Sequence, residues 1–291
     1  MAIASTSPAA PILPPAHPMT NPNRPRPKPM TWAIRWGIGI ISLVLITALT
    51  WGSVLARPAI ATPDAVPIDA AKAPAEFPYT YRDRPSSDGI GKIYLGREIA
   101  KVMGYEGAGW LERPGRERQE NPTAAIAALD LQPDDIVADI GAGTGYFSTR
   151  IAQQIPDGKV LAIDVQPEMI DILTWMKTEY GLENLQPILG TEQDPNLPAN
   201  SVNLVLMVDV YHELAYPYEV MTRLVQSLKP AGRIIILEYR AENPFVLIKR
   251  RHKMSLKQLQ REMKTVGLQL IGSPNILPQQ HYAIFQKATQ I

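Results

Sequence analysis

From residue 121 onward, short runs of apolar residues alternate with segments whose apolar positions recur at helical spacing. The run 202–208 and the run 233–237 are apolar enough for central parallel strands with both faces buried. Regular strand–helix alternation predicts a doubly wound α/β sheet. We expect strands at 136–140, 159–163, 185–189, 202–208, 233–237, 268–271 and 281–285, and helices at 122–129, 146–154, 167–180 and 255–266.

The first part of the chain has a different pattern. Residues 1–29 contain nine prolines and no hydrophobic periodicity, which predicts a disordered tail. No side chain from residue 36 to residue 56 is charged, and Ile, Leu and Val dominate residues 37–55. We therefore expect residues 30–56 to be a transmembrane helix or signal anchor, with membrane contact through residues 36–56. A signal peptide cleaved after Ala56 and an organelle transit peptide are the alternatives.

Residues 57–76 form a Pro- and Ala-rich linker before a segment, 77–120, in which aromatic and basic residues are interleaved. Apolar positions within 90–103 recur at helical spacing, which predicts a helical cap over residues 77–120, ahead of the main domain at 121–291.

Composition narrows the function. The net charge is +1, and no acidic residue precedes Asp64, so the rest of the chain is slightly acidic. This balance is not typical of a nucleic-acid-binding domain, and we expect no nucleic-acid partner. The chain has no cysteine, which excludes disulfides, thiolate metal sites and a cysteine nucleophile. No metal site is expected.

A glycine turn lies between the first expected strand and its helix. Asp139 ends an apolar run, and Gly141, Gly143 and Gly145 follow at alternate positions. Glycines allow a tight reversal and let backbone N–H groups approach a ligand. A dinucleotide fingerprint would need its third glycine where Tyr146 stands, so that pattern fails.

This D-x-G-x-G-x-G turn, with Asp164 ending the second strand, resembles the cofactor motif of class I S-adenosylmethionine-dependent methyltransferases. The resemblance covers residues 121–287 and includes Leu-Lys-Pro-Ala-Gly at 228–232. It implies a seven-stranded Rossmann-like sheet ending in an antiparallel hairpin, and S-adenosyl-L-methionine as cofactor. The glycine turn would then lie against the methionine and ribose, and Asp164 would hold the two ribose hydroxyls.

The ends of the third and fourth strands supply the remaining candidates. Family members place an acid at the end of the third strand, near the adenine; Thr191 stands there, so Glu192 or Asp194 is expected to take the role. Asp209 ends the fourth strand and should flank the methyl-donor end of the cofactor. Three catalytic candidates follow directly, with a histidine suited to act as a base: Tyr211, His212 and Glu213.

Caps in this family often help to form the acceptor site, so four residues of 77–120 are further candidates: Tyr94, Arg97, Trp110 and Arg113. The alternative is that Tyr94 and Trp110 belong to the core of the cap and that the two arginines are solvated. The basic run 249–253 lies on the same edge of the expected sheet. It is either a solvated face or a contact for an anionic acceptor or lipid headgroups.

The sequence thus predicts a membrane-anchored methyltransferase acting on a small-molecule or lipid-like acceptor, in the branch that methylates small molecules and quinone precursors. A membrane-tethered binding protein without activity is one alternative, and a nucleotide-cofactor oxidoreductase is another. Basic residues before the apolar stretch favour a cytoplasmic N-terminus and a domain on the far side. S-adenosylmethionine is made in the cytosol, so the side occupied by the domain stays open.

Overall fold

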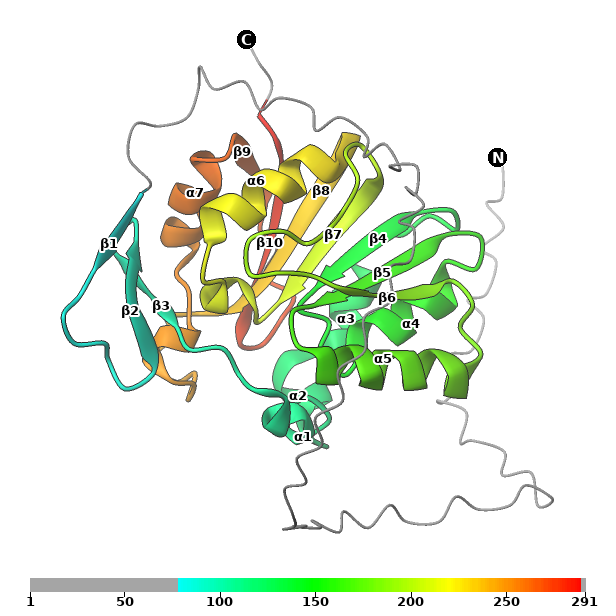
Figure 1. Ribbon diagram of the computed structural model, residues 1–291, viewed down its shortest axis with the longest axis horizontal. Helices are drawn as coiled ribbons and strands as arrows, with labels where there is room; N and C mark the ends of the chain where they lie inside the picture. The colour runs from blue at the N-terminus through cyan, green and yellow to red at the C-terminus, as the bar shows by residue number, and fades with distance from the viewer. Residues whose placement is uncertain (1–77, 289–291) are drawn as a thin grey trace, which may run out of the picture. The chain divides into compact units, whose positions relative to one another are not determined.

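A computed structural model describes residues 78–288 (Figure 1). No helix in that range is both long and apolar enough to cross a bilayer. The expected tail, membrane segment and linker, residues 1–76, lie outside the described range. The strands are β1 (Tyr79–Tyr81), β2 (Gly89–Tyr94), β3 (Arg97–Ala100), β4 (Ile136–Ile140), β5 (Lys159–Asp164), β6 (Leu185–Leu189), β7 (Val202–Val208), β8 (Leu228–Tyr239), β9 (Leu268–Gly272) and β10 (Gln280–Lys287). The helices are α1 (Ala108–Leu111), α2 (Arg116–Glu120), α3 (Pro122–Ala127), α4 (Tyr146–Gln154), α5 (Pro167–Tyr180), α6 (Pro217–Ser227) and α7 (Leu256–Lys264), with short 3₁₀ turns η2 (Tyr105–Gly107), η3 (Tyr211–Glu213) and η4 (Arg250–His252).

The main sheet confirms the expected doubly wound architecture. Its seven strands run in the order β6-β5-β4-β7-β8-β10-β9. Strands β4 to β8 pair in parallel, whereas β10 pairs antiparallel with both β8 and β9, which is the expected terminal hairpin. The expected 228–232 turn is instead the start of β8, where its pairing with β7 shifts register.

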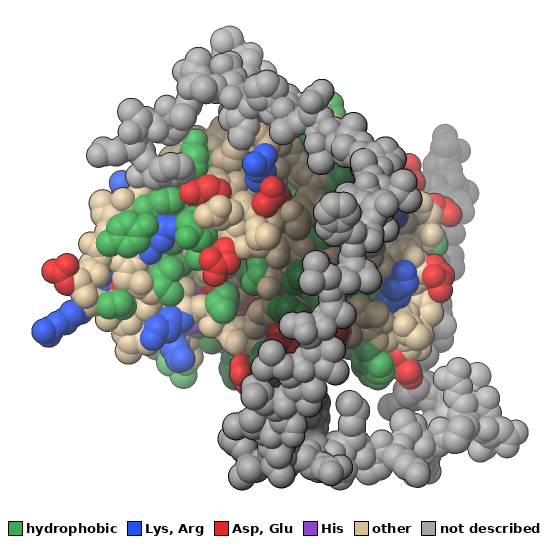
Figure 2. Space-filling model, in the orientation of Figure 1, with side chains coloured by type: hydrophobic (Ala, Val, Ile, Leu, Met, Phe, Trp, Pro, Cys, Tyr) green, Lys and Arg blue, Asp and Glu red, His purple; other side chains and the backbone are tan. Residues whose placement is uncertain are grey.

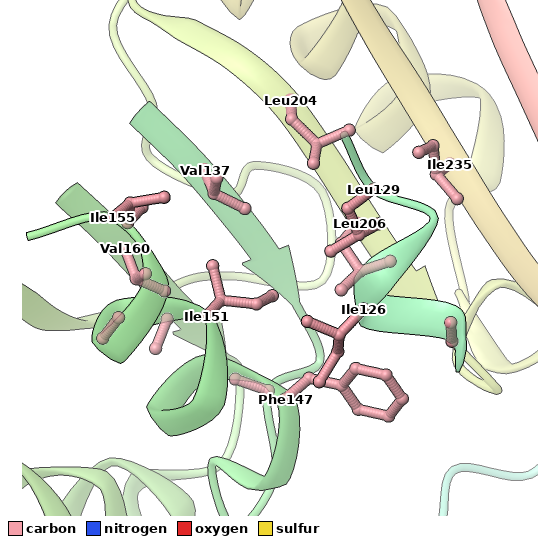
Figure 3. Packing of buried hydrophobic residues seen from close by; sticks show 14 of the residues in the cluster. Ile126, Leu129, Val137, Phe147, Ile151, Ile155, Val160, Leu204, Leu206 and Ile235 are labelled. Carbon is pink, nitrogen blue, oxygen red and sulfur yellow. The ribbon is translucent and has the colours of Figure 1, made fainter. Parts of the chain in front are cut away.

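Helices cover both faces of this sheet because its strands are apolar on both sides. Val137 of β4 packs in one cluster with α3, α4 and α5, and Figure 3 shows Ile126, Phe147 and Ile151 converging on that face. Its neighbour Ala138 belongs to a second cluster with α6 and α7. Successive side chains of a strand point to opposite faces, so each central strand is held between two helical layers.

The expected helical cap is wrong for its first half. Residues 89–100 form a β-hairpin within a three-stranded antiparallel sheet, ordered β1-β2-β3, and only residues 105–120 form short helices. Leu95 (φ 46°) and Gly96 (φ 86°) make the two-residue turn that brings Tyr94 opposite Arg97. Two positive φ angles are the mark of a type I′ turn and end any helix. Over so few residues the apolar positions fit both helical and strand spacing. The Leu95-Gly96 turn therefore determines that the segment is a β-hairpin.

The small sheet packs on α7, at the left of Figure 1. Arg97 forms a paired salt bridge with Glu262, with nitrogen–oxygen distances of 2.8 and 2.9 Å. The Tyr94 hydroxyl meets the Thr265 hydroxyl at 2.9 Å. In Figure 2 hydrophobic side chains gather over this sheet, interleaved with basic ones. Tyr94 and Arg97 therefore attach the cap to the domain. Tyr94 is buried, as its packing alternative predicted, whereas Arg97 neither lines the cavity nor is solvated.

Candidate active site

A cavity of about 1170 Å³ lies beyond the carboxyl ends of β4, β5 and β7, under the cap segment. Open α/β sheets bind ligands at this edge, where the parallel strands all end. The sheet contributes Gly141, Gly143, Asp164 and Asp209 to the cavity wall, and the cap contributes Met103, Trp110, Leu111 and Arg113. The cavity therefore joins the expected cofactor residues to residues of the cap.

The glycine turn adopts backbone angles that side chains disfavour. Gly141, Gly143 and Gly145 have φ values of 67°, 55° and 83°. A Cβ on Gly141 would come within 2.3 Å of Val210, and one on Gly143 within 2.7 Å of Leu111. Gly141 and Gly143 line the cavity, whereas Gly145 caps α4 and does not. Gly141 and Gly143 thus have no room for a side chain between the sheet and the cap, and their positive φ angles also favour glycine.

Asp164 ends β5 on the cavity wall and is nearly buried. Its Oδ2 accepts a hydrogen bond from the Gly143 N–H and its Oδ1 accepts one from the Gln166 N–H, both at 3.0 Å. Burial raises the pKa of this carboxyl, although both bonds oppose the shift. Each carboxylate oxygen can accept a second bond, so Asp164 can still receive two hydroxyl groups from a ligand.

Asp209 follows β7 in a left-handed conformation, with φ 52°. Gln280 donates to its Oδ2 at 2.7 Å, but its buried Oδ1 has no partner within residues 78–288. Burial first, and then the charges of Glu120 and Glu238, raise the pKa of Asp209 well above its usual range. A buried acceptor without a donor is costly, and an ammonium group in the cavity would satisfy it. Both acids therefore fit the expected cofactor.

Asp139 lies beneath the turn and does not line the main cavity. Its Oδ2 accepts the Ser148 hydroxyl at 2.5 Å, and both residues are buried. Burial raises the pKa of Asp139 to about 6, against the hydrogen bond from Ser148. The structure thus places Asp139 as a support that ties β4 to α4, rather than on the wall where the other cofactor candidates lie.

The loop after β6 brings one of its two acidic candidates to the cavity. Glu192 and Thr191 line it. Asp194 instead closes its own loop by accepting the Asn196 N–H at 2.8 Å, and lies 3.5 Å from Arg223. Of the two acidic candidates, Glu192 thus lies on the cavity wall and Asp194 does not.

The three catalytic candidates on η3 do not all face the cavity. Tyr211 is fully buried, does not line the cavity, and donates its hydroxyl to Glu262 at 2.7 Å. The expectation that it faces an acceptor is therefore corrected: the turn of η3 directs this ring into the core. His212 and Glu213 do line the cavity.

His212 is held on three sides. Its Nδ1 lies 2.6 Å from Glu238 Oε2, its Nε2 lies 3.1 Å from His252 Nδ1, and its carbonyl accepts from Arg97 at 3.1 Å. Burial acts to lower the pKa of His212, but Glu238 and Glu213 outweigh burial and raise that pKa to about 10. A histidine that keeps its proton at neutral pH cannot act as the expected base, so the simple base role of His212 does not fit its surroundings.

Another part of the wall was not expected from the sequence. Glu120 accepts hydrogen bonds from Arg113, Arg116 and the Tyr239 hydroxyl, and these four residues line the cavity. Arg113 also lies over the Trp110 ring, 3.9 Å from its centroid. Trp110 and Arg113 thus reach the cavity, as their functional alternative predicted. Glu238 and His252 carried no local signal, because each lies more than 25 residues from His212. Glu120 lies close in sequence to Arg113 and Arg116, but its contact with Tyr239 spans 119 residues.

The basic run 249–253 is partly engaged within the protein. Arg251 pairs with Glu98 at 2.9 Å, and Lys253 donates to the Val246 carbonyl at 3.1 Å. Lys249 lines the cavity. Of this run, Lys249 and His252 are thus the residues that can meet a ligand in the cavity.

Residues 131–289 match the family model described as a methyltransferase domain. The chain is 34% identical over 119 residues to an uncharacterised methyltransferase of Mycobacterium tuberculosis, covering 41% of this chain and 46% of that one. It is 30% identical over 122 residues to a demethylmenaquinone methyltransferase of Symbiobacterium thermophilum, covering 41% and 48%. The matched region thus spans about half the length of these relatives.

The fold also resembles that of a solved methyltransferase structure. A S-adenosylmethionine-dependent methyltransferase from Aquifex aeolicus superposes with a TM-score of 0.59 at 22% identity, covering 63% of this chain and 99% of that one. The expected S-adenosyl-L-methionine cofactor is confirmed at the level of the family. With the matched domain spanning more than half of its length, the chain belongs to the class I S-adenosylmethionine-dependent methyltransferases.

Proposed function

We propose that this protein transfers the methyl group of S-adenosyl-L-methionine to a small, largely apolar acceptor bound in the same cavity. The supporting observation is that a single cavity is lined on one side by residues suited to the cofactor and on another by residues suited to an acceptor. The first, the cofactor wall, consists of Gly141, Gly143, Asp164 and Asp209. The second, the acceptor wall, consists of Met103, His212, Glu213 and His252.

The size and lining of the cavity favour two ligands, one of them apolar. At about 1170 Å³ the cavity exceeds the roughly 300–1,000 Å³ of a site for one small molecule. Beyond the cofactor wall, aliphatic side chains come from the cap, from the segment after η3 and from the loop before η4: Ile90, Val102, Met103, Leu214, Leu247 and Ile248. Charged side chains also line this part, among them Asp88, Lys92 and Lys101. A cavity whose surface is mainly apolar suits a small-molecule or lipid-like acceptor better than a nucleic acid.

The residues of the cofactor wall divide the binding work. The glycine turn admits the ligand, Asp164 accepts the ribose hydroxyls, and the free Oδ1 of Asp209 accepts the ammonium group. Glu192 lies where the adenine would end. When bound, the cofactor supplies an electrophilic methyl group on a sulfonium ion. The acceptor's lone pair forms the new bond to that carbon while the carbon–sulfur electrons stay on sulfur, so the protein has chiefly to align the two.

Membrane attachment through residues 36–56 is a separate proposal. It is supported by the uncharged apolar stretch and by the exposed Phe245 and Leu247, 86% and 92% accessible, in the loop that closes one side of the cavity. An apolar acceptor would reach such a cavity directly from a bilayer. Sedimentation of the full chain with membranes, compared with a chain beginning at residue 57, tests this proposal.

The function is tested with the full-length protein in detergent. Calorimetric titration with S-adenosylhomocysteine should show binding that Asp164→Ala weakens roughly hundredfold, because about 3 kcal/mol of charge-assisted hydrogen bonding to the ribose is lost. Asp157→Ala removes an exposed carboxylate at the other end of β5 and serves as the matched control. Transfer of a radiolabelled methyl group to fractions of a membrane lipid extract should follow binding.

Three results would contradict the proposal. Equal affinity of parent and Asp164→Ala would remove the cofactor assignment. Binding with no transfer to any fraction would favour a binding protein without activity. Label appearing in added tRNA, and not in the small-molecule fractions, would overturn the acceptor class.

A further inference from the structure

Three polar atoms converge on the acceptor wall from two distant parts of the chain. His212 and Glu213 come from η3, after β7, and His252 comes from η4, after β8. Each offers one atom, and the three atoms lie within 4.8 Å of one another. All three residues line the cavity. A group of two imidazoles and one carboxylate facing a cavity is a set of metal ligands.

The spacing of these atoms matches a coordination shell. His212 Nε2 lies 3.1 Å from His252 Nδ1, His252 Nδ1 lies 3.2 Å from Glu213 Oε1, and Glu213 Oε1 lies 3.6 Å from His212 Nε2. An ion with bonds of about 2.0–2.1 Å in tetrahedral geometry separates its ligands by about 3.3 Å. The observed triangle brackets that value, so an ion could be bound with little movement of the side chains.

The surroundings of the three residues also suit a metal centre. Metal-binding histidines usually donate their second ring nitrogen to a carboxylate, and His212 Nδ1 lies 2.6 Å from Glu238 Oε2. The second oxygen of Glu213 accepts the Met103 N–H at 3.1 Å, which fixes that carboxylate. An ion bound by His212 Nε2 would displace the proton that this imidazole otherwise carries. Two carboxylates beside two neutral imidazoles then give the site a charge that one divalent cation would neutralise. The nearby Arg251 is already paired with Glu98.

We propose that His212 Nε2, His252 Nδ1 and Glu213 bind a divalent transition-metal ion of the zinc type, with Glu238 orienting His212. Two nitrogen ligands and one oxygen ligand favour such an ion over Mg²⁺ or Ca²⁺, which prefer oxygen alone. Three protein ligands leave at least one position open, as in catalytic rather than structural zinc sites.

The open position faces the cavity that holds the acceptor in the proposed function, on which this step rests. A hydroxyl oxygen of the acceptor bound there would lose its proton to water more readily, since a bound cation stabilises the oxyanion. That oxygen would then form the bond to the methyl carbon. Glu213 and Asp164 line the same cavity, so the ligand set shares that cavity with the cofactor wall. The acceptor class would therefore be a hydroxylated apolar molecule.

The test uses the full-length protein, stripped with a chelator and titrated with Co²⁺ and with Zn²⁺. We expect one tightly bound equivalent, and visible absorption bands of low-symmetry Co²⁺. His252→Ala and Glu213→Gln should each lower the affinity roughly hundredfold or more, and Glu238→Gln by about ten- to hundredfold, as for other residues that orient a ligand. His281→Ala is the matched control, because His281 also pairs with a glutamate, Glu242, at 2.9 Å, but lies on β10 and does not line the cavity.

S-adenosylhomocysteine titration of every variant reports whether the domain is folded, and separates the two proposals. A parent protein that binds this ligand but no stoichiometric Co²⁺ overturns the metal site alone. So does Co²⁺ binding that survives both His252→Ala and Glu213→Gln, since the ion then lies elsewhere. A protein that binds Co²⁺ but not S-adenosylhomocysteine overturns the proposed function and leaves the metal site standing.

Discussion

The two walls of the cavity are built in opposite ways. The cofactor wall takes its residues from the ends of adjacent parallel strands, where backbone geometry and single carboxylates define it. The acceptor wall joins the segment after β3, η3 and η4, and is held by ion pairs and hydrogen bonds between residues far apart in sequence. The first follows from the sheet itself, whereas the second depends on how the cap and the late loops dock on it.

The largest expected effect is on the docking of the cap. Glu262→Gln leaves the nearly buried Arg97 without its carboxylate. Breaking a buried ion pair from one side costs about 3–5 kcal/mol, so urea denaturation should show that loss in the free energy of unfolding. Arg223→Met breaks an exposed pair, with side chains 46% and 39% accessible, and should cost under about 1 kcal/mol. Equal losses in the two variants would mean that the cap is not anchored by Arg97.

A smaller effect is expected beneath the cofactor wall. The pKa of Asp139 is raised from 3.8 to about 6 in the folded protein. Below pH 3.8 the residue is protonated in both states and its burial carries no penalty. As pH rises through about 6 the unfolded state releases its proton first, and stability falls. Asp139→Asn should therefore be more stable than the parent at pH 7 by on the order of 2 kcal/mol.

The difference between Asp139→Asn and the parent should vanish near pH 4, when both are measured without cofactor. A difference that does not change with pH would show that Asp139 is ionised in the fold throughout, and that its hydrogen bond with Ser148 matters more than its burial.

The cofactor wall should also show a pH-dependent affinity. Burial, and then the charges of Glu120 and Glu238, raise the pKa of Asp209. An ammonium group bound there would favour the carboxylate form, so affinity for S-adenosylhomocysteine should rise with pH through the range in which Asp209 loses its proton. Asp209→Asn should weaken binding roughly tenfold, about 1.4 kcal/mol, and flatten the profile. A sloping profile in the variant would assign the pH dependence to another group.

The smallest effect concerns the hairpin of the cap. Leu95 holds a left-handed conformation at φ 46°, which costs a branched apolar residue more than it costs asparagine. Leu95→Asn should raise the free energy of unfolding by about 0.5–1 kcal/mol and leave cofactor affinity unchanged. Its backbone carbonyl still accepts from Gln258. A loss of stability instead would show that the Leu95 side chain contributes packing to the cap.

The contrast between the cofactor wall and the acceptor wall also explains which features could be predicted from the sequence. The strands of the main sheet, α4 and α5 were predicted closely, because each is a long or strongly periodic segment. Gly141, Gly143, Asp164 and Asp209 were predicted from a local motif that resembles the cofactor motif of a known family, and all four line the cavity because they lie at the ends of adjacent strands. Their order along the chain therefore predicts that they lie near one another in the fold.

The acceptor wall could not be found in that way. His252 was seen only as part of a basic run, and Glu238 stood one residue beyond the expected strand 233–237. Their contacts with His212 form only when η3, η4 and β8 come together in the fold. Tyr211 was misplaced since a single turn decides which of three successive side chains faces the cavity. The β-hairpin at 89–100 was missed because a short segment fits two periods equally well.

The cap covers the glycine turn at several points. Leu111 lies close to Gly143, the Thr144 hydroxyl donates to Glu112 at 2.6 Å, and the Gln166 amide donates to the Met103 carbonyl at 3.2 Å. A cofactor seated on the turn would therefore lie against the cap as well as the sheet. Tightening any of these contacts would then be expected to slow cofactor exchange without changing the chemical step.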